Sequence, residues 1–354
     1  IYTLSLHDAL PIYPVMTRET KKHGSAGMVT KILIAAVMVS LLVVTASASE
    51  TIRNWLSNYF FSETGEPLSQ EQVLFLEENE KRLDERLVRN DWTIELRSAI
   101  TDGMKGYILL GITAPEGTSL EDIPGKSQST YYGPGNDFLL KSENAVLHCS
   151  AYPDFGGVLG SIQDRWIEDG DGRSNTVNYI IDVAPDLGWA EGDPFDTAAK
   201  WSIHIENLVY GFPEQTILAE GIWDFEFAFE YDKAEINMLK EPVKTLAWAY
   251  PGDGTEIETE VTVTSMVLRP FGITLWYGDD SDGLDYSRTS VSFTDSDSAR
   301  HPWFAVMQDG SRIELYYSNG NPVERYVSLE ASVPIVLDDV AYLLLSDGTE
   351  LAVP

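Results

Sequence analysis

Apolar and polar residues alternate in short segments through most of the chain after residue 91. The alternation is clearest in residues 92–96, 201–205 and 223–229, where every second side chain is apolar. Successive side chains of a β-strand point to opposite faces of a sheet, so this period of two predicts strands with one buried face. Residues 105–113 and 176–183 are predicted to form further strands. This part of the chain is therefore expected to fold as sheets.

Turn-forming pairs of residues separate the predicted strands. Glycine tolerates a positive φ, and Asp and Asn favour turns, so each pair can close a tight hairpin. The number of such turns favours antiparallel sandwiches over alternating strand–helix units. The fold class predicted is mainly β, with two antiparallel, immunoglobulin-like β-sandwich domains. The Asp-Gly or Asn-Gly pairs begin at Asp102, Asp169, Asp171, Asp253, Asp282, Asp309, Asn319 and Asp347.

A break near residues 240–254 marks the expected boundary between these two domains. There Lys-Glu-Pro and Tyr-Pro-Gly-Asp-Gly interrupt the alternation. The prediction is a first domain over residues 91–240, with a polar insertion at about 116–144, and a second domain over residues 241–354.

Residues 49–90 are predicted to be helical. Apolar residues recur at helical spacing between 52 and 60. Ser69 is a predicted N-cap with Gln72 as its capping-box partner, and this helix is expected to run to about Arg89. Its expected inward-facing residues are Val73, Leu76, Leu83 and Leu87.

The N-terminus carries an export signal. Residues 1–12 resemble the translation of a sequencing adapter and are left out of the fold prediction. Within residues 13–48, four basic residues precede an apolar run at 32–44 and a small-residue ending. This order predicts either a signal peptide cleaved after Ala48 or an uncleaved transmembrane anchor helix. Basic residues that flank an apolar segment stay on the cytoplasmic side of the membrane. Both readings therefore place the chain from Ser49 onward outside the cytoplasm.

Charge and composition restrict the partners and the means of stabilisation. The formal net charge of −32 repels nucleic acid, so no nucleic-acid partner is expected. Hydrophobic residues make up 44% of the chain, enough for a large buried core. The single cysteine, Cys149, cannot form an internal disulfide, so burial must stabilise the fold.

Two strand-and-turn segments resemble a known bacterial family. Residues 93–103 read TIELRSAITDG and residues 107–117 read YILLGITAPEG. Together with residues 334–340 and 346–349, they are similar to the family called domain of unknown function 4179. The resemblance implies a single-pass protein of Gram-positive bacteria with extracytoplasmic β-domains, in some members linked to sigma-factor control. It supplies no catalytic residues.

Two acidic clusters are candidate cation sites. The first contains Glu168, Asp169 and Asp171, and the second contains Asp279, Asp280, Asp282 and Asp285. An EF-hand loop needs acids at alternate positions, Gly at the sixth and Glu at the twelfth, and neither cluster meets that register. Both are predicted to be acidic hairpin turns, and no metal or cofactor is expected.

Histidine, cysteine and tryptophan supply the remaining candidates for chemistry. His148 and Cys149 are adjacent, so on a strand they point to opposite faces, which does not suit a nucleophile and its base. His204 is predicted to face solvent, and His301 to lie in a loop. Tryptophans can stack on a sugar, but they more often fill a sandwich core. They are Trp166, Trp189, Trp201, Trp223, Trp248, Trp276 and Trp303.

No stretch carries a catalytic signature, so the sequence favours a non-catalytic protein. The expected function is binding, sensing or an envelope role on the outer side of the cell membrane, or after secretion. Its partner would be a protein or a cell-wall glycan, besides the membrane itself if the N-terminal segment is uncleaved. The alternative is an envelope hydrolase or carbohydrate-active domain that uses a pair of carboxylates.

Overall fold

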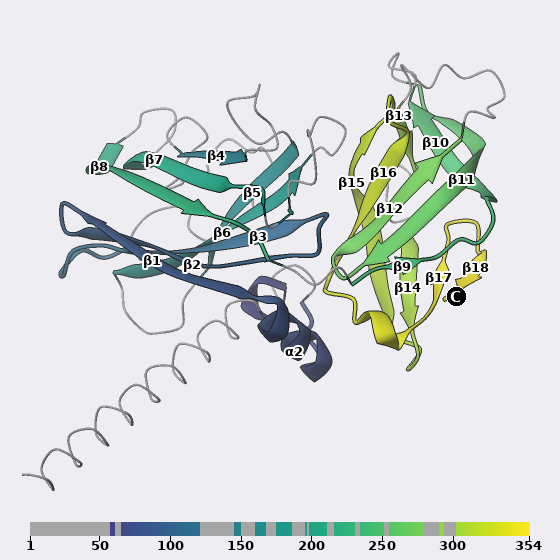
Figure 1. The fold of residues 1–354 in the computed structure, drawn as a ribbon, viewed down its shortest axis with the longest axis horizontal. Helices are drawn as coiled ribbons and strands as arrows, with labels where there is room; N and C mark the ends of the chain where they lie inside the picture. Colours follow the sequence, from purple (N-terminus) through teal and green to yellow (C-terminus); the bar gives the residue numbers. More distant parts are fainter. Residues whose placement is uncertain are drawn as a thin grey trace, which may run out of the picture. The chain divides into compact units, whose positions relative to one another are not determined.

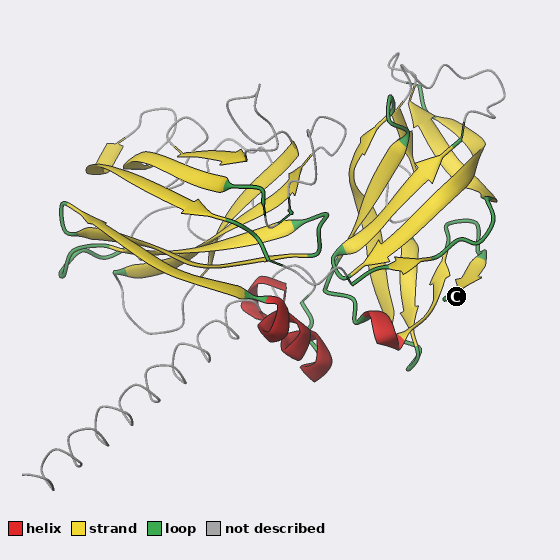
Figure 2. Cartoon of the chain, in the orientation of Figure 1, coloured by secondary structure: helices red, strands yellow, loops and turns green. Residues whose placement is uncertain are grey.

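The computed structural model shows a mainly β fold built from antiparallel sheets, which confirms the predicted fold class at that level (Figures 1 and 2). It describes residues 57–60, 65–120, 145–149, 160–167, 175–185, 195–196, 198–210, 216–230, 234–250, 255–278, 290–293 and 302–354. All of them belong to one compact unit, Thr51–Pro354. The N-terminal segment and the two acidic clusters lie outside the described residues.

The first part of the fold contains a five-stranded and a three-stranded sheet. Figure 1 shows the smaller sheet facing the larger one. The larger sheet has the order β1-β2-β3-β6-β5, and the smaller has the order β4-β7-β8. Their strands are β1 (Lys81–Arg89), β2 (Trp92–Thr101), β3 (Gly106–Thr113), β4 (Ala145–Cys149), β5 (Gly160–Ile167), β6 (Thr176–Pro185), β7 (Trp201–Tyr210) and β8 (Thr216–Phe227).

Strand β3 is buried on both faces, which explains its nearly continuous apolar sequence. Ile108 and Leu110 belong to the core shared with Trp201 and Trp223 of the smaller sheet. The alternate residues, including Tyr107, belong to a separate cluster on the other face. The five-stranded sheet therefore has a core on each side.

The second part of the fold is a ten-stranded antiparallel sheet with the order β13-β10-β11-β12-β16-β15-β14-β17-β18, in which β9 also pairs with β11. The sheet curls, so that β13 at one edge approaches β15. Its core surrounds Trp303 and Leu275. The elements are β9 (Ile236–Asn237), β10 (Val243–Tyr250), β11 (Ile257–Arg269), β12 (Gly272–Tyr277), β13 (Ser290–Ser292), β14 (Trp303–Met307), β15 (Arg312–Asn321), β16 (Tyr326–Ala331), the 3₁₀ helix η2 (Leu337–Asp339), β17 (Val340–Leu344) and β18 (Glu350–Ala352).

Helix α2 (Gln70–Asn79) begins as predicted but ends early. Ser69 caps it, and both hydrogen bonds of the capping box with Gln72 are present. The expectation that the helix runs to about Arg89 is wrong, because β1 follows almost at once. Leu83 and Leu87 do face the core, but from a strand that contains a bulge. A spacing of four residues fits a strand as well as a helix, and pairing with β2 decides between them.

The turn predictions had mixed outcomes. Asp102-Gly103, Asp309-Gly310 and Asp347-Gly348 each lie between paired strands with the glycine at positive φ, as predicted. Asn319-Gly320 is not a hairpin turn but lies within β15 beside a shift of register. A Cβ on Gly320 would stand 3.0 Å from the carbonyl oxygen of Tyr326, so this glycine permits a close approach of two backbones.

Within the part of the chain that the structure describes, no helix is long and apolar enough to cross a membrane.

Candidate functional site

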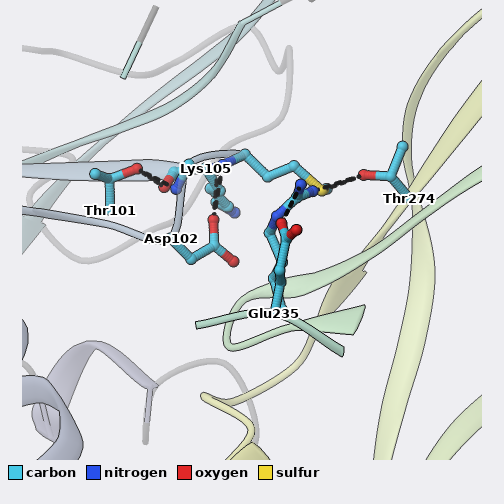
Figure 3. A network of polar contacts seen from close by, with 8 residues as sticks. Thr101, Asp102, Lys105, Glu235 and Thr274 are labelled. Carbon is cyan, nitrogen blue, oxygen red and sulfur yellow. Dashed lines mark hydrogen bonds and ion pairs between the residues drawn. The ribbon is translucent and has the colours of Figure 1, made fainter. Parts of the chain in front are cut away.

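The turn between β2 and β3 brings polar side chains into the interior. The Thr101 hydroxyl donates a hydrogen bond of 2.6 Å to the carbonyl oxygen of Lys105. Oδ1 of Asp102 accepts hydrogen bonds from the backbone N–H groups of Met104 and Lys105, at 2.9 and 3.0 Å. Figure 3 shows Thr101, Asp102 and Lys105 within this turn. The side chains of the turn therefore satisfy several of its own backbone groups.

Asp102 also joins the first part of the fold to the second. Its Oδ2 accepts a hydrogen bond of 2.7 Å from the backbone N–H of Phe271, between β11 and β12. In the same region the Thr274 hydroxyl of β12 contacts the sulfur of Met104. Burial raises the pKa of the Asp102 carboxyl, and the hydrogen bonds from Lys105, Met104 and Phe271 oppose that shift.

Lys105 places a buried ammonium group between two carboxylates. Its Nζ lies 2.7 Å from Oδ2 of Asp182 on β6 and also pairs with Glu330 on β16. Only 5% of the Lys105 side chain is exposed, against 7% for Asp182 and 12% for Glu330. Burial lowers the pKa of the Lys105 ammonium, and the Asp182 carboxylate opposes the shift. The three side chains come from three separate segments and connect both parts of the fold.

Aromatic side chains enclose this charged cluster. Nζ of Lys105 stands 5.0 Å from the centre of the Tyr107 ring, and the Tyr59 hydroxyl donates a hydrogen bond of 3.3 Å to Oδ2 of Asp182. The Tyr107 ring packs edge-on against Tyr59, Phe60 and Phe271. Burial raises the pKa of the Tyr107 hydroxyl well above its ordinary value. The enclosure keeps bulk water away from the charges and strengthens their interaction.

An accessible groove lies elsewhere, between the start of α2 and the β14–β15 hairpin. Its cavity volume is about 810 Å³. The amide Nε2 of Gln72 donates a hydrogen bond of 2.7 Å to the carbonyl oxygen of Pro334, which holds the start of α2 beside this groove. The acidic side chains that line it are Glu66, Glu71, Asp309, Glu314 and Asp339, with Arg312 as the basic residue and Phe304, Met307, Ile313, Val333 and Val336 among the apolar ones.

Among the histidine and cysteine candidates, His204 is the one whose side chain the structure describes. His204 is exposed, as predicted, and its Nδ1 lies 2.6 Å from Oδ1 of Asp224. His148 and Cys149 end strand β4, with Ser202 and Trp201 as their respective backbone partners. His301 lies outside the described residues. Over the described ranges, no group of three or more His, Cys, Asp or Glu side chains is placed to hold a metal ion.

The first acidic cluster, which is Glu168, Asp169 and Asp171, lies outside the described residues. The same holds for the second cluster, which is Asp279, Asp280, Asp282 and Asp285. That both clusters are acidic hairpin turns stays a prediction.

Most of the described tryptophans fill cores, as the sequence favours. Trp201, Trp223, Trp248 and Trp303 are buried, so they offer no ring for sugar stacking. Trp276 is half-buried. The side chain of Trp166 and all of Trp189 lie outside the described residues.

Sequence reasoning missed Lys105, Asp182 and Glu330 as a group. Lys105 and Asp182 belong to segments that were predicted as strands, and a charged residue inside an apolar strand was the available signal. Nothing in the sequence indicates that these two positions meet Glu330, because the meeting depends on how the sheets are placed in space.

Comparison with known proteins gives a distant structural likeness. The chain is similar to a solved structure described as the crystal structure of the conserved domain protein from Bacillus anthracis, with a TM-score of 0.42 and 11% sequence identity. The similarity covers 75% of this chain and 76% of that chain. No protein-family model matches the chain, and no match is found among curated proteins.

Proposed function

We propose that this chain is an extracytoplasmic, membrane-anchored binding or sensing protein, and that its recognition site is the groove beside α2. The ligand class is a cationic, amphipathic segment of a partner protein or peptide. The observation that carries the proposal is the composition of the groove, where five carboxylates and one guanidinium surround apolar side chains. Acidic groups attract basic residues, and the apolar lining supplies area for burial.

The N-terminal sequence supports the compartment. A basic, apolar and small-residue order at residues 18–49 is typical of an exported or anchored protein. Binding outside the membrane would then be the input of a signalling protein, in keeping with the resemblance to domain of unknown function 4179 and its link to sigma-factor control. We further propose that residues 91–240 and 241–354 are two immunoglobulin-like sandwich domains of that external region.

At the two sites described above, the carboxyl groups with shifted pKa values support binding over the hydrolase alternative. A general acid for glycoside hydrolysis needs a carboxyl group with a raised pKa that faces the substrate. The raised pKa of Asp102 belongs to a buried group bonded to backbone N–H donors. In the groove, Ser311 donates hydrogen bonds to Asp309 and lowers the pKa of that carboxyl, which is the opposite of what a general acid requires.

The test is a binding titration of the full chain with a cationic amphipathic peptide, at two salt concentrations. We expect saturable binding that weakens as salt rises. The double variant Glu66→Gln with Glu314→Gln should bind at least about tenfold more weakly, a loss of about 1.4 kcal/mol.

The matched control is Glu226→Gln with Glu258→Gln, which makes the same charge change at exposed positions outside the groove lining. Equal affinity losses in the two double variants would show that only net charge attracts the peptide. That result would remove the groove from the proposal.

A further inference from the structure

The enclosed pair of Lys105 and Asp182 has the components of an amide bond. Lys105 directly precedes β3, and Asp182 lies on the adjacent strand β6, where its Cα pairs with Tyr107. Nζ of Lys105 is 2.7 Å from Oδ2 of Asp182. An amine and a carboxyl group held in contact react as an intramolecular pair, which greatly raises their effective concentration.

The surroundings favour the neutral amine that such a reaction needs. Burial lowers the pKa of the Lys105 ammonium, and a desolvated lysine is a nucleophile. The Tyr59 hydroxyl donates a hydrogen bond to Oδ2 of Asp182 and so withdraws electron density from that carboxyl group. The Glu330 carboxylate also contacts Nζ, where it can accept and return a proton.

We propose that Lys105 Nζ and the side-chain carboxyl group of Asp182 condense into an amide cross-link, with Glu330 as the proton carrier. Glu330 first takes a proton from the Lys105 ammonium and passes it to the Asp182 carboxylate. The nitrogen lone pair then attacks the Asp182 carboxyl carbon and forms the C–N bond. Glu330 removes a proton from that nitrogen and gives it to the hydroxyl group, which leaves with the electrons of the broken C–O bond as water.

The atoms and charges of this step balance without another reagent. One ammonium and one carboxylate become one amide and one water molecule, and Glu330 ends as the carboxylate that it was at the start. No electron donor or acceptor is involved.

The cross-link would supply a covalent closure that cysteine cannot supply in this chain. With the single Cys149, no internal disulfide is possible. A bond from Lys105 to Asp182 closes a long segment of chain, and covalent closure of long loops restricts the unfolded state most. It would also fix the start of β3 beside β6, at the point where Asp102 and Lys105 contact the second part of the fold.

Peptide mapping of the full chain tests the proposal directly. The protein is purified, denatured and digested with trypsin, and the peptides are identified by mass spectrometry. We expect peptide 98–126, uncleaved after Lys105, joined to peptide 174–200, with a combined mass one water molecule below their sum. Full recovery of peptide 98–105 and of an unlinked peptide 174–200 would overturn the proposal. A link from Lys105 to the peptide that contains Glu330 would overturn the choice of acceptor.

Variants assign the roles. Lys105→Arg keeps the positive charge but not the nucleophile, so peptide 174–200 should be recovered unlinked. Lys81→Arg, at the ion pair with Glu230, is the matched control and should keep the cross-link. Glu330→Gln should slow cross-linking by about 100-fold or more if Glu330 carries the proton, and an unchanged rate would remove that role. Because Lys105→Arg can impair folding, the peptide map of the unaltered chain decides by itself.

Discussion

The backbone N–H of Phe271 donates a hydrogen bond of 2.7 Å to the Asp102 carboxylate, across 169 positions of sequence. Asp102 lies in the turn after β2, and Phe271 lies between two strands of the ten-stranded sheet. Both residues are almost fully buried. One side chain therefore organises its own turn through Oδ1 and holds a distant backbone segment through Oδ2.

Replacing Asp102 by Ala should destabilise the fold by about 2 to 4 kcal/mol, because buried N–H donors lose their acceptor. The measurement is the free energy of unfolding in denaturant, with the slope checked for constancy. Asp309→Ala is the control, since Asp309 starts a similar Asp-Gly hairpin but is exposed. A loss for Asp102→Ala no larger than for Asp309→Ala would contradict the bridging role.

The raised pKa of Asp102 predicts the pH dependence of its contribution. The folded state holds the proton more tightly than the unfolded state, whose pKa is near the ordinary value of 3.8. Between these two values the folded state binds more protons, so stability falls as pH rises. The unfolding free energy of the unaltered chain, measured relative to that of Asp102→Asn, should therefore fall as pH rises from about 3.8. A shift in the opposite direction would show that hydrogen bonding outweighs burial at this carboxyl group.

The buried face of α2 gives a packing prediction. Leu76 is 1% exposed, and Leu76→Ala should cost about 2 to 5 kcal/mol of unfolding free energy. Leu83 is half-buried on β1, so Leu83→Ala should cost less. Leu74 lies on the same helix with 45% exposure, and Leu74→Ala is the control with little effect. If Leu76→Ala matched Leu74→Ala in thermal unfolding, the helix would not be packed on the fold.

Local chemistry predicted the features that depend on a few neighbouring residues. The capping box of Ser69 and Gln72 was predicted correctly, and so were three Asp-Gly turns, because each depends on side chains within a few positions. Strand β1 was missed because its apolar spacing fits either secondary structure. Pairing with β2 makes this segment a strand. The apolar pattern of the segment does not indicate which other segment it pairs with.

The burial and pairing of the charged residues could not be predicted from the sequence, because they too depend on partners that are distant along the chain. Asp102 was recognised only as a turn residue, yet its burial comes from contact with Phe271. Lys105, Asp182 and Glu330 lie on segments that are far apart along the chain, and only the fold brings them together. By contrast, the outward position of His204 follows from strand parity alone and was predicted correctly.

The N-terminal sequence predicts where the folded part resides. Cells expressing the chain from Met16 should place residues 49–354 outside the cytoplasmic membrane, since a basic stretch, an apolar run and small residues occur in that order before Ser49. Intact protoplasts treated with an external protease provide the measurement, and we expect this portion to be digested. Its full protection, in cells where a cytoplasmic control protein is also protected, would contradict export.

Calcium tests the acidic clusters at residues 168–171 and 279–285, which we predict to be solvated turns without a tight ion site. A ligand that binds only the folded state at a hundredfold excess over Kd stabilises that state by about 2.7 kcal/mol. Millimolar calcium should therefore raise the unfolding temperature no more than sodium chloride of equal ionic strength, apart from the weak screening of an acidic surface. A distinctly larger rise that disappears in Asp169→Ala with Asp171→Ala would mean that the first cluster binds calcium. An ion-dependent structural or adhesive role would then be the better proposal. The fold would in that case supply calcium ligands that the local sequence, which lacks the EF-hand spacing, does not supply by itself.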